Sequence, residues 1–124
     1  MTVLPHIVAI VDDDASVRDA LALALSTRGW VPHVYASGEA FFQPNDERVA
    51  AQCLVLDLDL PNMNGVELLR RLNAMEWSIP TVVLTADPHG ALAQAALVEG
   101  AVVVLGKPAT YETLTQALEN VLNP

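Results

Sequence analysis

Residues 53–61 read Cys-Leu-Val-Leu-Asp-Leu-Asp-Leu-Pro, a short apolar run that leads directly into two acidic residues. An apolar run of this length is typical of a β-strand that is covered on both faces. Asp57 and Asp59 therefore stand at the carboxyl end of a predicted strand. Open parallel sheets bind their ligands beyond that end, so these two acids are candidate functional residues.

Four further runs share this apolar character, and helical patterns separate the five. The runs cover residues 6–11, 31–35, 53–57, 81–85 and 101–105. Strict alternation of strand and helix predicts βαβ units, and hence an α/β fold with a doubly wound, five-stranded parallel sheet and helices on both faces. Pro32 places the second strand at an edge, because proline cannot donate to a central ladder. Ser37, Asp87-Pro88 and Thr110 are predicted helix starts.

Composition narrows the functional classes. The chain has 124 residues, of which 52% are hydrophobic and 17% charged, as in one compact domain. Its formal net charge of −9 argues against direct binding to nucleic acid or to anionic membranes. No apolar stretch approaches the roughly 20 residues of a membrane span. With no signal peptide and one cysteine, Cys53, predicted to lie in the core, we expect a cytoplasmic protein.

The predicted strand ends bring polar residues from distant segments to one rim. Asp12 and Asp13 end the first strand, Asp57 the third and Thr85 the fourth, and Lys107 follows the fifth. Three carboxylates in one crevice repel each other, and a divalent ion that prefers oxygen ligands, Mg²⁺, would offset this repulsion. Lys107 and Thr85 can contact phosphate oxygens, and a carboxylate can act as the nucleophile. The sequence thus predicts a metal-assisted phosphoryl site.

Four motifs, all at strand ends, resemble the receiver domain of two-component response regulators, the CheY-like superfamily. They are Val11-Asp12-Asp13-Asp14, the segment from Leu56 to Gly65, Leu84-Thr85-Ala86-Asp87 and Gly106-Lys107-Pro108. This resemblance implies a flavodoxin-like sheet with strand order 2-1-3-4-5. It extends over residues 1–124, which we expect to form a single receiver domain, either a stand-alone protein or a part of a longer response regulator.

The resemblance also implies roles for the residues of the rim. Asp57 would be the phosphoacceptor and also a metal ligand. Asp13 would bind Mg²⁺ directly and Asp12 through water. Asp59 would lend the metal its backbone carbonyl, and its side chain would be solvated.

The remaining residues carried over by the resemblance lie on the phosphoryl side. Thr85 and Lys107 would contact the phosphoryl group, and the peptide before Pro108 would be cis. The phosphoryl donor would be a histidine kinase or a histidine phosphotransfer protein, and the domain would control a downstream output domain or protein. We expect Mg²⁺-dependent self-phosphorylation and self-dephosphorylation rather than enzymatic turnover.

Three features leave alternatives open. Receivers commonly carry Phe or Tyr three residues before the lysine, where this chain has Val104, so the usual switching route is in doubt and a non-switching interaction module is an alternative. Asp57-Leu58-Asp59 also resembles the nucleophile motif of haloacid-dehalogenase-type phosphatases. Finally, apolar residues such as Val103 in the fifth strand indicate core packing or a homodimer face formed with the last two helices.

Overall fold

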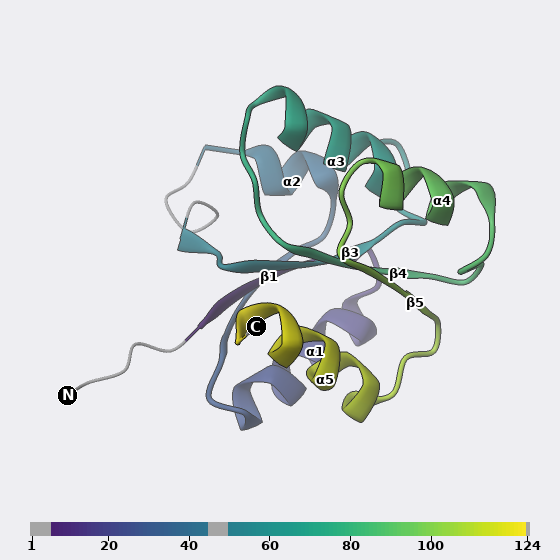
Figure 1. Cartoon of the computed structure of the whole chain (residues 1–124). Helices are drawn as coiled ribbons and strands as arrows, with labels where there is room; N and C mark the ends of the chain where they lie inside the picture. Colours follow the sequence, from purple (N-terminus) through teal and green to yellow (C-terminus); the bar gives the residue numbers. More distant parts are fainter. Residues whose placement is uncertain (1–5, 45–49, 124) are drawn as a thin grey trace.

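The protein folds around one parallel sheet, as the alternation of runs predicts (Figure 1). The computed structural model describes residues 6–44 and 50–123. Its strands pair in the order β2-β1-β3-β4-β5, which confirms the predicted 2-1-3-4-5 order. They are β1 (Ile7–Val11), β2 (Val31–Tyr35), β3 (Cys53–Asp57), β4 (Thr81–Thr85) and β5 (Val103–Gly106). Pro32 lies in the edge strand β2, in register with Val8 of β1.

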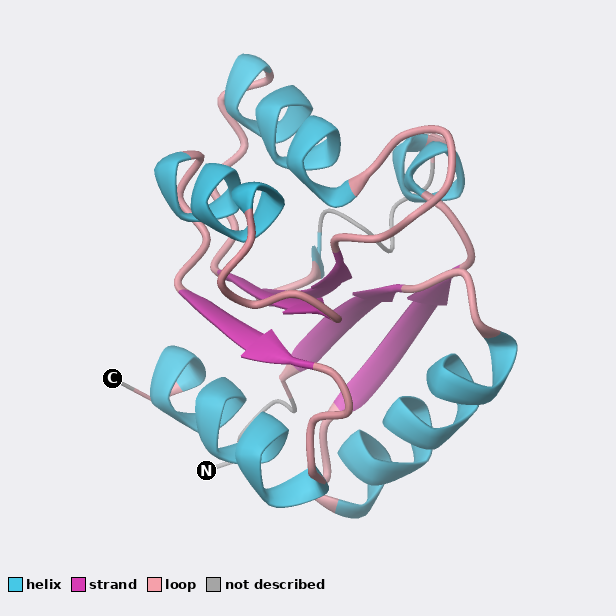
Figure 2. Cartoon of the chain, turned by 90° about the vertical axis from the view of Figure 1, so that its right-hand side faces the viewer, coloured by secondary structure: helices cyan, strands magenta, loops and turns pink. Residues whose placement is uncertain are grey.

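Helices cover both faces of the sheet, with α1 and α5 on one side and α2, α3 and α4 on the other (Figures 1 and 2). Their bounds are α1 (Ala15–Thr27), α2 (Gly38–Phe42), α3 (Gly65–Ala74), α4 (Ala91–Val98) and α5 (Tyr111–Leu122). Among the described residues, no helix is both long and apolar enough to cross a bilayer.

Each face of the sheet packs its own hydrophobic core. Neighbouring residues of β1 point to opposite sides, so Ala9 joins the core under α2, α3 and α4 while Ile10 joins the core above α1 and α5. Every residue of β3 and of β4 is buried. Burial on both faces explains why these two strands read as near-continuous apolar runs in the sequence.

Side-chain caps begin several of the helices, and two of these caps, Ser37 and Thr110, are the predicted starts. Asp14 accepts hydrogen bonds from the first turn of α1, and Ser37 and Thr110 do the same for α2 and α5. The predicted start at Asp87-Pro88 is wrong by a few residues, because the N-cap of α4 is Gly90. Residues 86–89 form a loop between the end of β4 and this N-cap.

The fifth strand begins two residues later than the predicted range 101–105. The Ala101 N–H donates to the Ala96 carbonyl at 3.0 Å and so closes the last turn of α4, after Gly100 with a φ of 105°. This is a glycine-based helix C-terminus, in which the residue after the glycine still belongs to the helix end. Hydrophobicity alone does not separate that residue from the strand that follows.

Hydrogen bonds between strands continue past the strand ends and align the rim. The Leu58 N–H donates to the Leu84 carbonyl at 2.9 Å, and the Lys107 N–H donates to the Thr85 carbonyl at 2.8 Å. Likewise the Asp12 N–H donates to the Tyr35 carbonyl at 3.1 Å. The first residues beyond each strand are therefore held side by side at one edge of the sheet.

Candidate functional site

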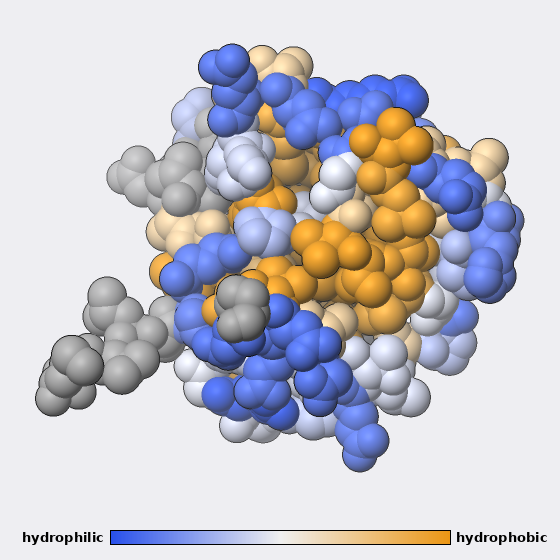
Figure 3. Space-filling model, viewed as in Figure 1, coloured by the Kyte–Doolittle hydropathy of each residue, from blue (hydrophilic) through white to orange (hydrophobic). Residues whose placement is uncertain are grey.

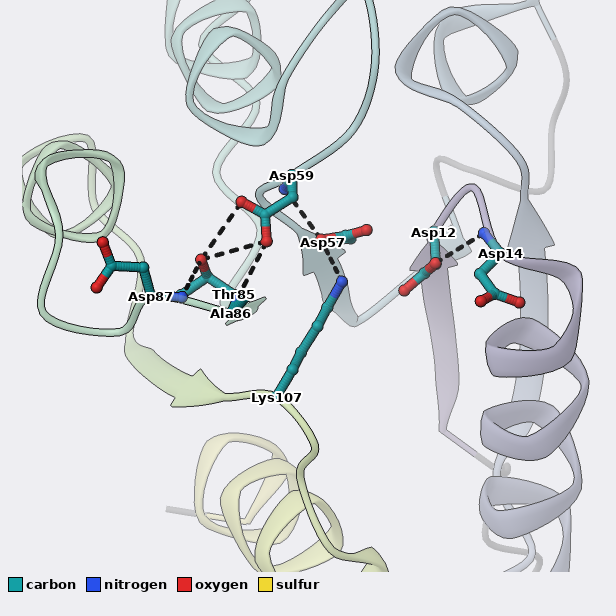
Figure 4. Close-up of polar contacts among 8 residues, drawn as sticks. All are labelled: Asp12, Asp14, Asp57, Asp59, Thr85, Ala86, Asp87 and Lys107. Carbon is teal, nitrogen blue, oxygen red and sulfur yellow. Dashed lines mark hydrogen bonds and ion pairs between the residues drawn. The ribbon is translucent and has the colours of Figure 1, made fainter.

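A buried carboxylate at the end of β3 forms the centre of the rim (Figure 4). The side chain of Asp57 is only 2% exposed, and its Oδ1 lies 2.7 Å from the Lys107 ammonium nitrogen. The same oxygen accepts the Asp59 N–H at 2.9 Å. Both donors thus hold one oxygen of Asp57, and Figure 4 shows the other oxygen directed toward Asp12.

Three carboxylates meet beside that second oxygen. Oxygen atoms of Asp12, Asp13 and Asp57 all lie within 4.8 Å of one another. Asp12 is buried, and although its Oδ1 accepts the Asp14 N–H at 2.9 Å, its buried Oδ2 has no hydrogen-bond partner among the residues that the structure describes. Buried polar atoms are ordinarily satisfied, so this orphaned oxygen is a candidate ligand atom for a cation.

The pKa of Asp12 also supports a cation site among these carboxylates. Burial raises the pKa of the Asp12 carboxyl above its usual value, the hydrogen bond from the Asp14 N–H opposes that rise, and repulsion from Asp57 adds to it. A cation placed among these oxygens would relieve both the burial cost and the repulsion. These three carboxylates could therefore hold a metal ion, and carboxylate oxygens are ligands that suit Mg²⁺.

Lys107 carries the positive charge of the site. Burial by itself lowers the pKa of the Lys107 ammonium, but the hydrogen bond and charge of Asp57 outweigh this, and the pKa rises above its usual value. Asp12 and Asp59 add further attraction. Lys107 is therefore a permanent cation at the mouth of the site. The Lys107–Pro108 peptide that follows it is cis, as the resemblance implies.

The hydroxyl of Thr85 lies at the end of β4, beside Asp59. Thr85 is buried, and its Oγ1 lies 3.4 and 3.5 Å from the two carboxylate oxygens of Asp59. Asp59 Oδ2 also accepts the Ala86 N–H at 3.1 Å. The Asp59 side chain is exposed, and it also bridges the two loops that follow β3 and β4.

Alternating burial explains why Asp59 points across to β4. Its neighbours Leu58 and Leu60 are both buried in the core under α2, α3 and α4, so Asp59 between them faces outward along the rim. At Gly65, which begins α3, a Cβ atom would approach a Leu58 methyl to 2.7 Å. This close approach of helix and loop requires glycine and fixes the position of the loop.

One contributor to the site was missed by sequence reasoning. Arg18, on the first turns of α1, donates from Nη1 to the backbone carbonyl of Asp12 at 2.8 Å. It thereby ties the acidic loop to α1. The signal for this role is its position four residues after the helix cap Asp14, which returns its side chain toward the start of the helix.

Comparison with known proteins gives a consistent result. Residues 8–119 match the family described as the response regulator receiver domain. The transcriptional regulatory protein FixJ of Rhizobium meliloti (strain 1021) is 38% identical over 116 residues, which are 92% of this chain and 55% of that protein. The transcriptional regulatory protein TrcR of Mycobacterium tuberculosis (strain ATCC 25618 / H37Rv) is 32% identical, over 95% of this chain and 46% of that protein.

Solved structures agree with the sequence matches. The crystal structure of FixJ-N superposes with a TM-score of 0.85 at 34% identity, covering 96% of this chain and 94% of the other. A putative response regulator from Chloroflexus aurantiacus J-10-fl gives a TM-score of 0.86 at 30% identity, covering 98% of this chain and 100% of the other.

Proposed function

The chain belongs to the response regulator receiver domain family, and on that premise we propose that Asp57 accepts a phosphoryl group from a histidine kinase or a histidine phosphotransfer protein. One observation carries the assignment. Asp57 is a buried carboxylate with Lys107 on one oxygen and the acidic pair of Asp12 and Asp13 beside the other. As a receiver domain, the chain is not a turnover enzyme.

The proposed step is a transfer of phosphoryl between two side chains. An oxygen of Asp57 attacks the phosphorus, the P–N bond to the donor histidine breaks, and the imidazole leaves with the electron pair of that bond. Lys107 then neutralises charge on a phosphoryl oxygen as a point charge. Thr85, at the end of the neighbouring strand, supplies a hydroxyl donor to another phosphoryl oxygen. Hydrolysis, in which water attacks the phosphorus and the O–P bond breaks to return the Asp57 carboxylate and inorganic phosphate, would limit the phosphate lifetime.

Asp12, Asp13 and Asp57 would hold Mg²⁺ through carboxylate oxygens, with Asp59 contributing its backbone carbonyl. When bound, the ion supplies charge neutralisation for the incoming phosphoryl oxygens. The protein's own contribution is to hold the three carboxylates together before the ion arrives. Arg18 supports this arrangement by fixing the Asp12 carbonyl.

The output of this switch is also proposed from the relatives. The chain spans about half the length of the curated relatives it matches. Those relatives are named as transcriptional regulatory proteins, which supports a cytoplasmic location and control of an output domain or partner protein by the phosphoryl group. We propose that residues 1–124 form one receiver domain, since a single sheet unites the described residues.

We further propose self-association through the face formed by α4, β5 and α5. Val98 is 85% exposed and Val102 is 55% exposed, and Figure 3 shows hydrophobic surface extending from α4 across β5. A groove between β5 and α5, lined in part by Val103, Ala117 and Val121, continues this surface. Exposed apolar patches of this kind mark interaction sites.

The two alternative functions receive less support. The family match and the relatives are receivers rather than phosphatases. In addition, the Asp59 side chain already accepts hydrogen bonds from the Ala86 N–H and the Thr85 hydroxyl. A non-switching module does not need the orphaned oxygen of Asp12 or the Lys107–Asp57 pair.

The test is intact-protein mass spectrometry after incubation with acetyl phosphate and Mg²⁺. We expect a labile gain of one phosphoryl group that Asp57→Ala abolishes, and we expect Lys107→Ala to impair the conformational response more than the labelling. Asp19→Ala, which removes an exposed carboxylate on α1, is the matched control and should label normally. Labelling of Asp57→Ala at the rate of the unaltered protein would refute the assignment.

A further inference from the structure

The side chain of Asp59 accepts hydrogen bonds from two donors near Asp57, the proposed phosphoacceptor. Its Oδ2 accepts the Ala86 N–H at 3.1 Å, and both of its oxygens lie within 3.5 Å of Thr85 Oγ1 (Figure 4). Thr85 Oγ1 in turn accepts the Asp87 N–H at 3.2 Å. The loop after β4 is thus tied to the loop after β3 by a single carboxylate.

This arrangement sets up a competition. A hydroxyl and a backbone amide each have one proton to donate, so Thr85 and Ala86 cannot donate fully to Asp59 and to a phosphoryl oxygen together. A phosphoryl group on Asp57 would also bring close to two negative charges next to the carboxylate of Asp59. Competition for the two donors and charge repulsion both weaken the contacts of Asp59 with Thr85 and Ala86.

We propose that Asp59 is a positioning residue that clamps the β4–α4 loop in the unphosphorylated protein, and that a phosphoryl group on Asp57 displaces its carboxylate from Thr85 and Ala86. This inference rests on the proposed phosphoacceptor function. Release of the clamp frees residues 86–90, which lead into α4. The clamp therefore connects the chemistry at Asp57 to the helix that borders the exposed apolar face.

The rest of this region explains why such a clamp matters in this chain. Val104 packs at the edge of the core under α4 and offers a short, branched side chain rather than a ring that could rotate. Within the described part of the chain, no side chain caps the start of α4, whose N-cap is Gly90. Asp59 reaches this loop from outside it and is itself adjacent to the reacting carboxylate.

The test compares Asp59→Ala, which removes the acceptor, with Asp59→Asn, which keeps an acceptor oxygen without the charge. Glu67→Gln removes an exposed carboxylate from the first turn of α3 and serves as the control. Two quantities are measured by NMR: the hydrogen-exchange rate of the Ala86 amide in the unphosphorylated protein, and the affinity for beryllofluoride in the presence of Mg²⁺.

In Asp59→Ala we expect Ala86 to exchange about tenfold faster, as loss of a charge-assisted hydrogen bond implies. We expect beryllofluoride to bind about three- to tenfold more tightly, because it no longer competes with a carboxylate for Thr85 and Ala86. Asp59→Asn should lie between Asp59→Ala and the unaltered protein. A residue that only supports the loop would give faster exchange with equal or weaker affinity.

Unchanged Ala86 exchange, or beryllofluoride affinity that is equal or weaker in Asp59→Ala, would overturn the clamp. Labelling of the unaltered protein by acetyl phosphate, measured alongside, separates the two proposals. If the unaltered protein takes up no phosphoryl group, the proposed function fails. If it is labelled while the affinity of Asp59→Ala does not rise, only the clamp fails.

Discussion

Substitution of a buried residue usually destabilises a protein, but the orphaned oxygen of Asp12 leads us to predict the opposite effect at this position. Replacing Asp12 by Asn should stabilise the metal-free protein. The Asn Oδ1 can still accept the Asp14 N–H, while its amide nitrogen replaces the oxygen that lacks a donor. The substitution also removes one of the charges in the group formed by Asp12, Asp13 and Asp57.

The structure gives the size of this effect. Oxygens of Asp12 and Asp57 lie within 4.8 Å, where two full charges repel by about 3.5 kcal/mol at an effective dielectric constant of about 20. Lys107, paired with Asp57 at 2.7 Å, offsets part of this repulsion. We therefore expect Asp12→Asn to raise the free energy of unfolding of the metal-free protein by about 1–2 kcal/mol.

The pH dependence of this difference has a definite sign. The pKa of Asp12 is raised in the folded protein, so the folded state holds its proton at pH values where the unfolded state has lost it. The contribution of the neutral carboxyl is complete below the unfolded pKa and is lost as pH rises through the folded pKa. The stability advantage of Asp12→Asn should thus be small near pH 4 and grow toward neutral pH.

Urea unfolding in EDTA and in Mg²⁺ measures both parts of the effect. Mg²⁺ at ten times its dissociation constant should stabilise the unaltered protein by about 1.4 kcal/mol and Asp12→Asn by much less. Asp14→Asn is the matched control, because Asp14 is exposed and Asn also caps helices well. Destabilisation of the metal-free protein by Asp12→Asn, or equal stabilisation of both proteins by Mg²⁺, would refute the reasoning.

Two further predictions concern the surface and the core. Val98→Glu should leave the monomer folded and weaken self-association at least about tenfold, because it places a charge on the exposed apolar face. Analytical ultracentrifugation in the presence of beryllofluoride measures the self-association, and an unaltered protein that stays monomeric would contradict the proposed face. Burial raises the pKa of the Cys53 thiol to about 12. Ellman's reagent should therefore react with the native protein about a thousandfold more slowly than with the protein unfolded in urea. Comparable reaction rates would contradict this prediction and show that β3 is accessible.

Much of this site follows from local sequence because it lies at the ends of strands. Apolar runs identify β1, β3 and β4, and parallel pairing then brings Asp12, Asp57 and Thr85 to one edge without knowledge of any side-chain contact. Proline in β2 similarly identifies an edge strand. These inferences depend on backbone periodicity and on the absence of a donor in proline, which are properties of short segments.

Contacts between loops, in contrast, do not follow from the sequence of any one segment. The direction of the Asp59 side chain depends on the burial of Leu58 and Leu60 and on the position of Ala86, which follows a different strand. The hydrogen bond from Arg18 to the Asp12 carbonyl likewise depends on how α1 leaves its cap. The late start of β5 arises because Ala101 completes the last turn of α4.

The sequence by itself determined the parallel sheet, its edge strand and the set of acids, hydroxyl and amine at its rim, because hydrophobic periodicity and strand ends are recorded residue by residue. Only the tertiary structure decided which oxygen of Asp57 is held by Lys107, which oxygen of Asp12 has no partner in residues 6–44 and 50–123, and that Asp59 ties two loops together. Those outcomes depend on distances of a few ångströms between segments far apart in the chain, and such distances are fixed by packing alone.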